Sequence, residues 1–223
     1  MNYTFQFAEV LAAWPLLLRG AWTTVQLSLL ATLLGLVVAI ACAWAKTAGQ
    51  KPLRWLIQAY IELVRNTPFL VQLFFLFFGL PALGLRWSPY TAALTAMVVN
   101  LGAYATEIIR AGIESIPKGQ IEAGLALNLK AHQIFRLIVL KPALRAIFPA
   151  LTSQFILLML TSAVVSVISA DDLTSVAANL QSQTFRSFEI YIVVTLIYLA
   201  LALAFSGLFH AFQRHALSYP DRR

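Results

Sequence analysis

Long apolar stretches without a charged residue separate the charged segments of this chain. Gly20 to Ala45 is one such stretch, and Ala146 to Ala170 is another. Each exceeds the roughly 20 residues that a helix needs to cross a hydrocarbon core about 30 Å thick. Because lipid offers no hydrogen-bond partners, a spanning backbone must form helices or a closed barrel. Stretches this long and continuously apolar are typical of helices, so we predict an all-α integral membrane protein.

The composition supports the same fold class. Hydrophobic residues make up 60% of the 223 residues and charged residues 11%. One membrane domain is therefore expected rather than a soluble core. The net charge is +7, but the basic residues flank the apolar stretches and form no stripe with aromatic residues between them. This pattern excludes a nucleic-acid partner and favours a role in orienting the chain in the bilayer.

The sequence offers no evident site for catalysis or metal binding. Cys42 is the only cysteine and lies inside an apolar stretch, and no two of the three histidines have metal-ligand spacing. No nucleophile–histidine arrangement is recognisable either, so we predict a non-catalytic subunit. A phosphate loop of the form GxxxxGK followed by Ser or Thr is also missing. If nucleotide hydrolysis drives this protein, another chain supplies the ATPase.

Three further apolar segments bring the number of predicted spans to five. The segment before residue 20 is partly polar and interrupted by Pro15, so it is predicted to be an interfacial lead-in. The chain thus divides into an N-terminal interfacial segment (1–19), a transmembrane domain (20–215) and a tail (216–223). The predicted spans are 20–45, 53–79, 87–106, 146–170 and 190–213.

Lysine and arginine residues give the orientation, because cytoplasmic loops are enriched in them. If the segment after the first span is cytoplasmic, the outer side holds only Arg19, Arg86 and Arg186. We therefore predict that the N-terminus is outside and that the C-terminal tail is cytoplasmic. The basic residues assigned to the inner side are Lys46, Lys51, Arg54, Arg110, Lys118, Lys130, Arg136, Lys141, Arg145, Arg214, Arg222 and Arg223.

The segment between the third and fourth spans is longer and more polar than a connection requires. This predicted cytoplasmic loop, 114–145, has one helical pattern from about Gln120 to Leu127 and a second one after Asn128. Asn tolerates the left-handed backbone of a turn, and Pro142 is expected to end the second helix. A helix pair on one membrane face indicates a docking surface for a soluble partner. The alternative is a pair that only caps the bundle.

Ionisable residues inside an apolar segment are costly, so they mark either a structural pair or a pathway. On the second span, Glu62 and Arg65 are three residues apart and can pair with each other. Together with Thr67 they are also candidates for the substrate path. Pro68 removes a backbone hydrogen bond and frees carbonyl groups for polar contacts.

The third span carries three polar side chains on one face: Asn100, Tyr104 and Glu107. Asn100 either bonds to a neighbouring helix or lines the path, and Tyr104 is a path candidate beside it. Glu107 and Arg110 are three residues apart at the cytoplasmic end. There we expect a structural or gating pair.

Two more pairs of polar residues belong to the fourth span and its outer end. Thr161 and Ser162 are candidates for the path, although hydroxyl groups on membrane helices often bond their own backbone. Asp171 and Asp172 follow on the outer side and are candidates for an outer gate. Such acids can meet basic groups of a binding protein or a cationic substrate. A solvated loop is the simpler alternative.

Several motifs resemble those of the permease subunits of ABC importers. Glu122-Ala123-Gly124, with Asn128 six positions after the Glu, and the following IVLKPALR resemble the EAA loop of that family. Two further matching motifs are ELVRNTP at 62–68 and AYATEIIRAGI at 103–113. The resemblance covers roughly residues 20–215. It points to the subfamily that takes up polar amino acids such as histidine, glutamine, glutamate, arginine and opines.

The resemblance implies a type I permease fold with a short coupling helix at about 119–130, seated in a cleft of a cytoplasmic ATPase subunit. The family usually has Gly at the position of Asn128 and Pro-Gln at the position of Lys141-Pro142. It also has Lys-Asp where Met159 and Leu160 stand here, so the path lacks that lysine. The residues expected to face the ATPase or to shape the helix are Gly119, Gln120, Glu122, Ala123, Gly124, Asn128 and Lys130.

By the same resemblance, the chain is a permease subunit of an ATP-driven amino acid importer in the bacterial inner membrane. It would pair with a second permease subunit, as a homodimer or a heterodimer, and with ATP-binding subunits that use ATP and Mg²⁺. A periplasmic or extracytoplasmic binding protein would deliver the amino acid, and this chain would bind no cofactor itself. The alternative is an ion-gradient-driven secondary transporter. That class gives no reason for the cytoplasmic helix pair, and no inverted repeats are evident.

Overall fold

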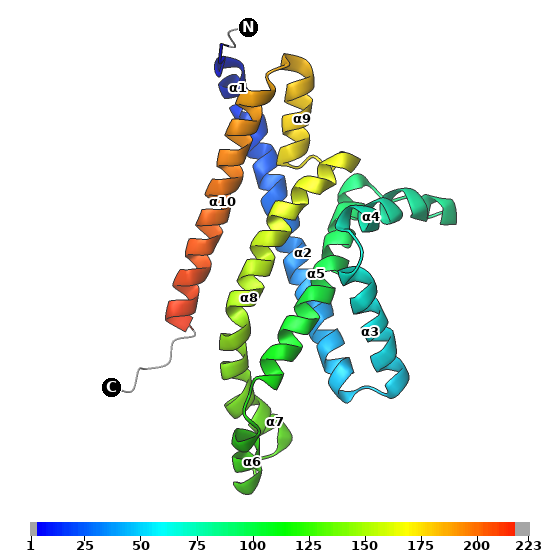
Figure 1. The fold of residues 1–223 in the computed structure, drawn as a ribbon, viewed down its shortest axis with the longest axis vertical. Coiled ribbons are helices and arrows are strands. Elements are labelled where there is room, and N and C mark those ends of the chain that lie inside the picture. The colour runs from blue at the N-terminus through cyan, green and yellow to red at the C-terminus, as the bar shows by residue number, and fades with distance from the viewer. Residues whose placement is uncertain (1–3, 217–223) are drawn as a thin grey trace.

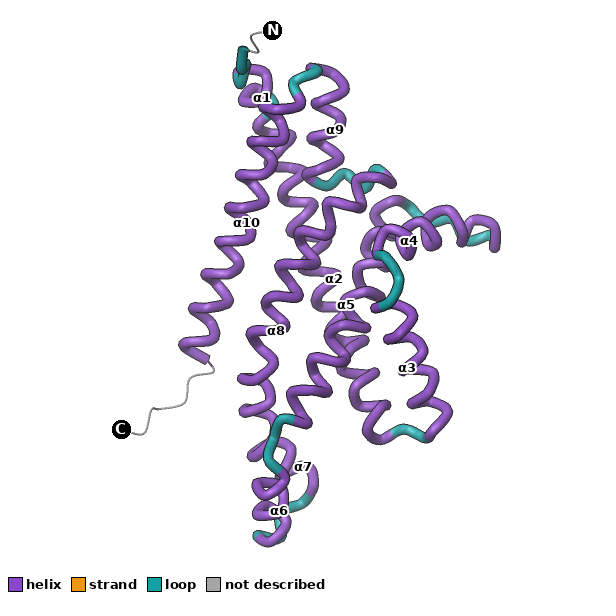
Figure 2. Tube along the Cα trace, in the orientation of Figure 1, coloured by secondary structure: helices purple, strands orange, loops and turns teal. Residues whose placement is uncertain are grey.

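The computed structural model describes residues 4–216, and this part of the chain forms helices and no strand. Figures 1 and 2 show an elongated bundle. The short helix α1 (Ala8–Ala12) lies at one end, called the α1 end below. Helices α6 (Lys118–Ala126) and α7 (Ala131–Ile134) lie at the opposite end, called the α6 end. Residues 1–3 of the predicted lead-in and 217–223 of the predicted tail lie outside the described residues.

Four helical segments of the described chain are long and apolar enough to cross a membrane, and a bent pair is a fifth candidate. They overlap the first, third, fourth and fifth predicted spans. The first is α2 (Trp14–Ala48), which starts before residue 20 because Pro15 lies in its first turn. Proline is well tolerated there, since the N–H groups of a first turn have no partner in the helix. The four segments are Trp14–Thr47, Pro89–Glu114, Ala131–Ile168 and Ser187–Ala216.

The second predicted span is bent rather than straight. Helix α3 (Lys51–Arg65) stops at its C-cap Asn66, and the next helical segment, Phe69–Leu83, leaves it at 109°. Pro68 explains the break, because it lacks an N–H and keeps the preceding residue out of the helical region. The predicted span 53–79 is therefore not one straight helix, and the bent pair is its counterpart. The second segment consists of α4 (Phe69–Phe74), the π turn η1 (Phe75–Gly79) and the 3₁₀ turn η2 (Leu80–Leu83).

Helices α2 and α5 (Pro89–Glu114) form the centre of the bundle. Small residues permit this close packing, as is usual for helices inside a membrane. A Cβ added to Gly35 of α2 would lie 2.9 Å from Leu101 Cδ2, and one added to Gly102 of α5 would lie 2.9 Å from Val38 Cγ1. Residues of α5 that are at most 1% exposed include Ala92, Ala93, Ala96, Ala103 and Ala105.

The remaining helices surround this centre. Helix α8 (Leu140–Thr161) continues into the 3₁₀ segment η4 (Ser162–Ile168). The polar segment after it is helical: α9 (Leu173–Thr184) packs on α2 with Leu173 and Ala177 buried. The last helix, α10 (Ser187–Ala216), leaves most of its apolar surface uncovered, and phenylalanines join it to α8. These are Phe148 and Phe155 on α8, and Phe205, Phe209 and Phe212 on α10.

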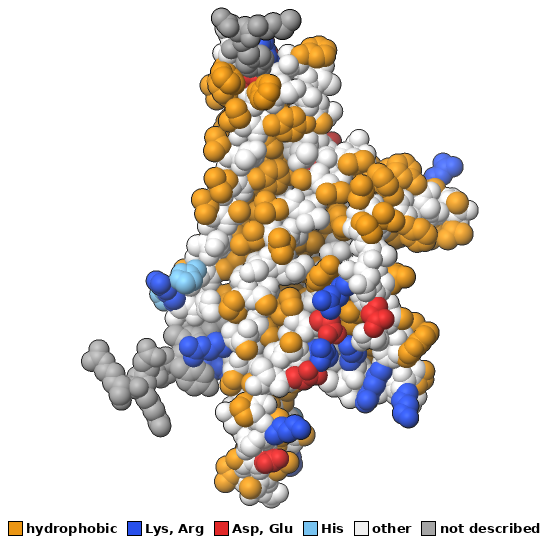
Figure 3. All heavy atoms as spheres, viewed as in Figure 1, with side chains coloured by type: hydrophobic (Ala, Val, Ile, Leu, Met, Phe, Trp, Pro, Cys, Tyr) orange, Lys and Arg blue, Asp and Glu red, His pale blue; other side chains and the backbone are white. Residues whose placement is uncertain are grey.

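Charged side chains are distributed unevenly along the bundle. On the face drawn in Figure 3, most Lys and Arg side chains lie toward the α6 end, over α3, over the segment 114–145 (called the insert below) and over the last turns of α10. The surface toward the α1 end is mainly hydrophobic or uncharged on that face. On that face, the charged and the mainly uncharged surfaces therefore lie toward opposite ends of the bundle.

Candidate functional site

A rigid turn ends the first helix of the insert. Asn128 has φ 57°, the left-handed conformation that the sequence predicted for it. Its N–H donates to Leu125 O at 2.9 Å, and Leu129 N–H donates to Gly124 O at 3.1 Å. These are the two hydrogen bonds of a Schellman cap, and asparagine is the residue other than glycine that most readily occupies its left-handed position. The turn is therefore fully hydrogen-bonded without a glycine.

Gly124 determines how α6 lies against the second half of the insert. It is buried, and a Cβ added to it would lie 2.7 Å from Ile138 Cδ1 and 3.1 Å from Ile134 Cγ1. A larger residue here would force the side chains of Ile138 and Ile134 to move. The residues expected to face the ATPase or to shape the helix thus divide into one packing residue (Gly124), one turn residue (Asn128) and an exposed group. The exposed group comprises Gly119, Gln120, Glu122, Ala123 and Lys130.

Large apolar side chains surround this exposed group. Leu127 is 74% exposed, and Leu125, Phe135 and Leu137 are also exposed. A groove of about 670 Å³ lies beside them, between α6 and the second half of the insert. Exposed apolar surface next to a groove is typical of a protein-binding site. The residues lining the groove are Ser115, Ile116, Pro117, Gln120, Ala123, Leu137, Ile138 and Pro142.

Pro142 does not end the second helix of the insert, contrary to the prediction. Helix α7 continues through the π turn η3 (Phe135–Val139) into α8, which begins at Leu140. Inside an ordinary helix, a proline leaves the carbonyl four residues earlier without a partner and clashes with it. The wider π turn directly before Pro142 accommodates this defect without a break. The insert and the fourth candidate span are consequently one continuous helical segment, Ala131–Ile168.

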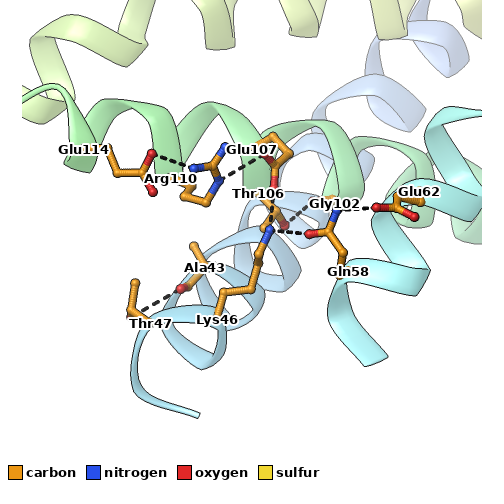
Figure 4. Close-up of polar contacts among 10 residues, drawn as sticks. All are labelled: Ala43, Lys46, Thr47, Gln58, Glu62, Gly102, Thr106, Glu107, Arg110 and Glu114. Carbon is orange, nitrogen blue, oxygen red and sulfur yellow. Dashed lines mark hydrogen bonds and ion pairs between the residues drawn. The ribbon is translucent and has the colours of Figure 1, made fainter. Parts of the chain in front are cut away.

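An ion-pair network joins α2, α3 and α5 near the α6 end (Figure 4). Lys46 Nζ lies 2.8 Å from Glu107 Oε1 and donates to Gln58 Oε1 at 2.7 Å. Glu107 Oε2 also lies 2.8 Å from Arg110 Nη2, which confirms the predicted pair. The side chains of Lys46 and Glu107 are only 16% and 20% exposed, so water screens this pair weakly. We call Lys46, Gln58, Glu107 and Arg110 the inner network.

The predicted pair between Glu62 and Arg65 is not formed among the described residues. Glu62 Oε1 instead accepts a hydrogen bond from Gln58 Nε2 at 2.7 Å, which connects it to the inner network. The Arg65 guanidinium lies 5.4 Å from the centre of the Tyr104 ring, a cation–π distance. Glu62 is thus paired with another residue of its own helix, and Arg65 with the ring of Tyr104 on α5. Both residues line a cavity of about 280 Å³, together with Gln58, Ile61, Asn66, Tyr104 and Glu107.

Gln72 holds the bend of the second span together. Its Nε2 donates to the carbonyls of Val64 at 2.8 Å and Thr67 at 3.1 Å, and to Thr67 Oγ1 at 2.9 Å. Its Oε1 accepts from Asn100 Nδ2 at 3.3 Å, so Asn100 bonds to a neighbouring element, one of its two predicted alternatives. The carbonyls left free by the break are satisfied by one side chain, as the position of Pro68 predicted.

The hydroxyl groups of Ser162 and Ser166, which follow α8, donate hydrogen bonds to backbone carbonyls of the same helical segment. Ser162 is fully buried, and its Oγ donates to Met159 O at 2.7 Å. Ser166 Oγ likewise donates to Ala163 O at 2.7 Å. Thr161 is partly exposed. Ser162 therefore has the structural role that is common for hydroxyls in membrane helices, and Thr161 is the member of the pair with accessible surface.

The two neighbouring aspartates have different environments. Asp172 is fully buried and caps α9: its Oδ1 accepts from Ser175 N–H at 2.9 Å and its Oδ2 from Thr174 N–H at 3.1 Å. Burial raises the pKa of this carboxyl, while these hydrogen bonds oppose the rise. Asp172 is therefore a helix cap with no accessible surface, and the prediction that it faces an outer gate is wrong for it. Asp171 is exposed, with φ 53°.

Sequence reasoning missed three residues that organise these sites. Lys46 was assigned only to a cytoplasmic loop, and Gln58 and Gln72 were not singled out. A signal existed for Gln72, because an amide inside an apolar stretch requires a partner. No comparable signal existed for Lys46, whose partner Glu107 is distant in the sequence and is brought close by packing of α2 on α5.

The fold is that of an all-helical membrane protein that carries a short, exposed helix at one end. Residues 11–217 match the family described as binding-protein-dependent transport system inner membrane component. The chain belongs to this family. Two relatives are permease proteins: the L-cystine permease TcyB of Bacillus subtilis strain 168 is 34% identical over 92% of this chain and 88% of its own. The glutamine permease GlnP of Escherichia coli strain K12 is 35% identical over 94% and 97%.

Solved structures agree with this assignment. A chain of a crystal structure of an amino acid ABC transporter with histidines is 37% identical, with a TM-score of 0.90 over 95% of this chain and 99% of that one. A chain of the inward-facing MetNI methionine ABC transporter is 21% identical with a TM-score of 0.71, a likeness of fold alone. The predictions of an ABC permease subunit and of a non-enzyme are confirmed. Nothing among these relatives supports the secondary-transporter alternative.

Proposed function

We propose that this chain forms half of the translocation path of an ATP-driven amino acid importer in the bacterial inner membrane. The observation that carries the proposal is the insert: a short helix, locked by the cap at Asn128, that exposes Glu122 and lies beside a groove. A soluble partner is the simplest occupant of such a surface. Relatives whose names specify cystine, glutamine and arginine transport support an amino acid as the substrate.

The topology that we propose has five spans, with the bent pair 51–65 and 69–83 counted as one. The α1 end is outside, and the α6 end and the C-terminus are cytoplasmic. Two observations support this orientation: the excess of Lys and Arg toward the α6 end, and the direction of α10, which runs from the α1 end toward the α6 end. An odd number of spans places the termini on opposite sides.

Coupling to ATP hydrolysis would act through α6. The ATPase subunits bind ATP and Mg²⁺ and close upon them, and α6 follows this closure as a rigid body. Because α7 continues into α8 without a break, movement of the insert would pass directly into a transmembrane helix. At its N-terminal end, the insert follows α5, and Arg110 and Glu107 lie close to the end of that helix. The insert is thus attached at both ends to spans that can move with it.

The path would be completed by a second permease subunit, the same chain or a homologous one. Candidates on this chain are the residues around the cavity beside Arg65 and Tyr104, because that cavity combines opposite charges with an aromatic surface. A binding protein would deliver the amino acid at the α1 end. The candidate path residues are Glu62, Arg65, Thr67, Asn100, Tyr104 and Thr161.

Reconstitution tests this proposal. The chain, co-expressed with the ATPase and the second permease subunit of its transporter, would be placed in proteoliposomes and supplied with its binding protein. We expect uptake of radiolabelled amino acid, tested with L-glutamine, L-arginine and L-cystine, only when ATP reaches the ATPase. Uptake that proceeds equally fast without ATP, and follows an imposed proton or sodium gradient, would contradict the proposal.

A further inference from the structure

A separate cleft lies at the α1 end of the molecule, far from the insert. Its volume is about 570 Å³, within the range of small-molecule sites. One wall is the first turns of α2, another is the start of α5, and the third is the loop between η4 and α9. Polar or aromatic side chains occur on all three walls: Arg19, Thr23, Gln26, Ser88, Tyr90, Ser169 and Asp171.

The cleft contains one cation and one anion that do not neutralise each other. Arg19 and Asp171 both line it and both are exposed. Among residues 4–216 neither Arg19 nor Asp171 belongs to an ion pair. Their side chains also form no hydrogen bond within this range. Both charges are therefore available to a ligand that enters the cleft.

The backbone holds these two charges in a fixed relation. Leu173 N–H donates to Thr24 Oγ1 at 3.1 Å, which ties the start of α9 to α2. A Cβ added to Gly20 would lie 2.9 Å from Leu173 Cα, so the loop rests directly on the helix turn that carries Arg19. The neighbours of Asp171, Ala170 and Asp172, are 3% and 0% exposed and anchor the loop on both sides. A site that is already shaped loses less entropy when a ligand binds.

We propose that this cleft binds a zwitterion, whose ammonium group pairs with Asp171 and whose anionic group pairs with Arg19. Such charge-assisted hydrogen bonds are stronger than neutral ones and would orient the ligand between α2 and the α9 loop. Two sources supply this chemistry. One is the amino acid on its way from the binding protein, which rests on the function proposed above, and the other is the headgroup of phosphatidylethanolamine.

Uptake kinetics of the complete transporter test the cleft. Arg19→Gln and Asp171→Asn would be measured in proteoliposomes while the concentration of loaded binding protein is varied. If the cleft receives the amino acid, each variant lowers the maximum rate about tenfold, the loss of one charge-assisted contact, and leaves the half-saturating binding-protein concentration unchanged. Arg19→Lys and Asp171→Glu should restore part of the rate, since they keep the charge.

Matched controls and two lipid compositions separate the alternatives. Arg86→Gln and Glu9→Gln remove exposed charges that do not line the cleft, so wild-type rates are expected. Every protein would be measured in phosphatidylglycerol vesicles with and without phosphatidylethanolamine. A loss that is the same in both vesicles supports the amino acid as the ligand. If wild type without phosphatidylethanolamine is as slow as the variants, the zwitterion is the lipid headgroup.

Two results would overturn the proposal while leaving the importer function intact. One is wild-type kinetics for both variants in both vesicles. The other is a raised half-saturating concentration of binding protein with an unchanged maximum rate, as expected if Arg19 and Asp171 only contact that protein. Failure of wild type itself to take up amino acid with ATP would instead contradict the function proposed above.

Discussion

The two ends of this bundle use charge in opposite ways. At the α6 end, Glu107 lies 2.8 Å from both Lys46 and Arg110, and three helices meet at this network. At the α1 end, Arg19 and Asp171 line one cleft without a side-chain partner among the described residues. The paired charges are mostly buried and the unpaired ones are exposed.

This difference separates charges that hold the fold from charges that are free to recognise a ligand. A buried charge requires a partner, because its desolvation costs several kcal/mol otherwise. An exposed charge in a cleft is solvated by water and can exchange that water for a ligand. We therefore expect substitutions in the inner network to act on stability, and substitutions in the cleft to act on transport. The predictions below test this division in order of decreasing effect on stability.

Replacement of Glu107 should have the largest effect. Glu107→Leu leaves Lys46 with only Gln58 as its partner and Arg110 with only Glu114. Because Lys46 is 16% exposed, we expect a loss of about 3 kcal/mol in the free energy of unfolding. Thermal unfolding in detergent measures it. The double variant Lys46→Met/Glu107→Leu removes both charges and should recover part of the loss; if it is less stable than Glu107→Leu, the network does not act as a charge pair.

The neighbouring aspartates offer the sharpest internal contrast. Asp172→Ala removes two hydrogen bonds at the start of α9, and we expect a loss of about 1.5 kcal/mol, as for other helix caps. Asp171→Asn should change stability by less than about 0.5 kcal/mol, because the side chain is exposed and asparagine tolerates the same left-handed φ of 53°. The same unfolding assay compares them. Equal destabilisation by both would remove the distinction drawn here between a cap and a ligand-binding acid.

Substitutions of Asn128, in the turn of the insert, should have a smaller effect on stability, and its sign depends on the new residue. Asn128→Gly should stabilise the insert slightly or leave it unchanged, since glycine adopts φ 57° without strain. Asn128→Ala should destabilise it by about 1 kcal/mol, because alanine is strained in the left-handed region. Hydrogen exchange at the amide of Leu129, which bonds to Gly124 O, reports this locally. Faster exchange in the glycine variant than in the alanine variant would contradict the Schellman cap.

The outermost pair of the α6 end should contribute least. Arg110 Nη1 pairs with Glu114, whose side chain is 62% exposed. Exposed ion pairs contribute little, so Glu114→Gln should cost less than about 0.5 kcal/mol. A loss as large as that of Glu107→Leu, measured in the same detergent, would show that burial is not what distinguishes the members of this charged group.

The features that the sequence predicted are those that depend on neighbours along the chain. Continuous apolar composition located the candidate spans, and Asn128 between two helical patterns located the turn of the insert. The Glu107–Arg110 pair followed from helical spacing, because both residues lie on one helix. Family motifs added the role of the insert, which physical patterns alone left open.

The features that the sequence did not predict depend on packing in three dimensions. Apolar composition says nothing of direction, so the 109° bend after Arg65 was missed although Pro68 was noticed. Glu62 and Arg65 can pair by their spacing, but packing of α3 on α5 places Arg65 against the ring of Tyr104 instead. Pro142 was expected to end the second helix of the insert, but the π turn η3 before it allows the helix to continue. Asp171 and Asp172 are the same residue type, and their environments differ because Asp172 caps the start of α9.

The central claim, that α6 docks the ATPase, is tested most directly at Glu122. Glu122→Arg reverses an exposed charge on the docking surface without touching the buried packing at Gly124. Co-purification in mild detergent should recover a stoichiometric ATPase with the wild-type chain and with the control Glu9→Arg, and much less with Glu122→Arg, at equal levels of membrane insertion. Full ATPase recovery together with wild-type uptake by Glu122→Arg would contradict the account.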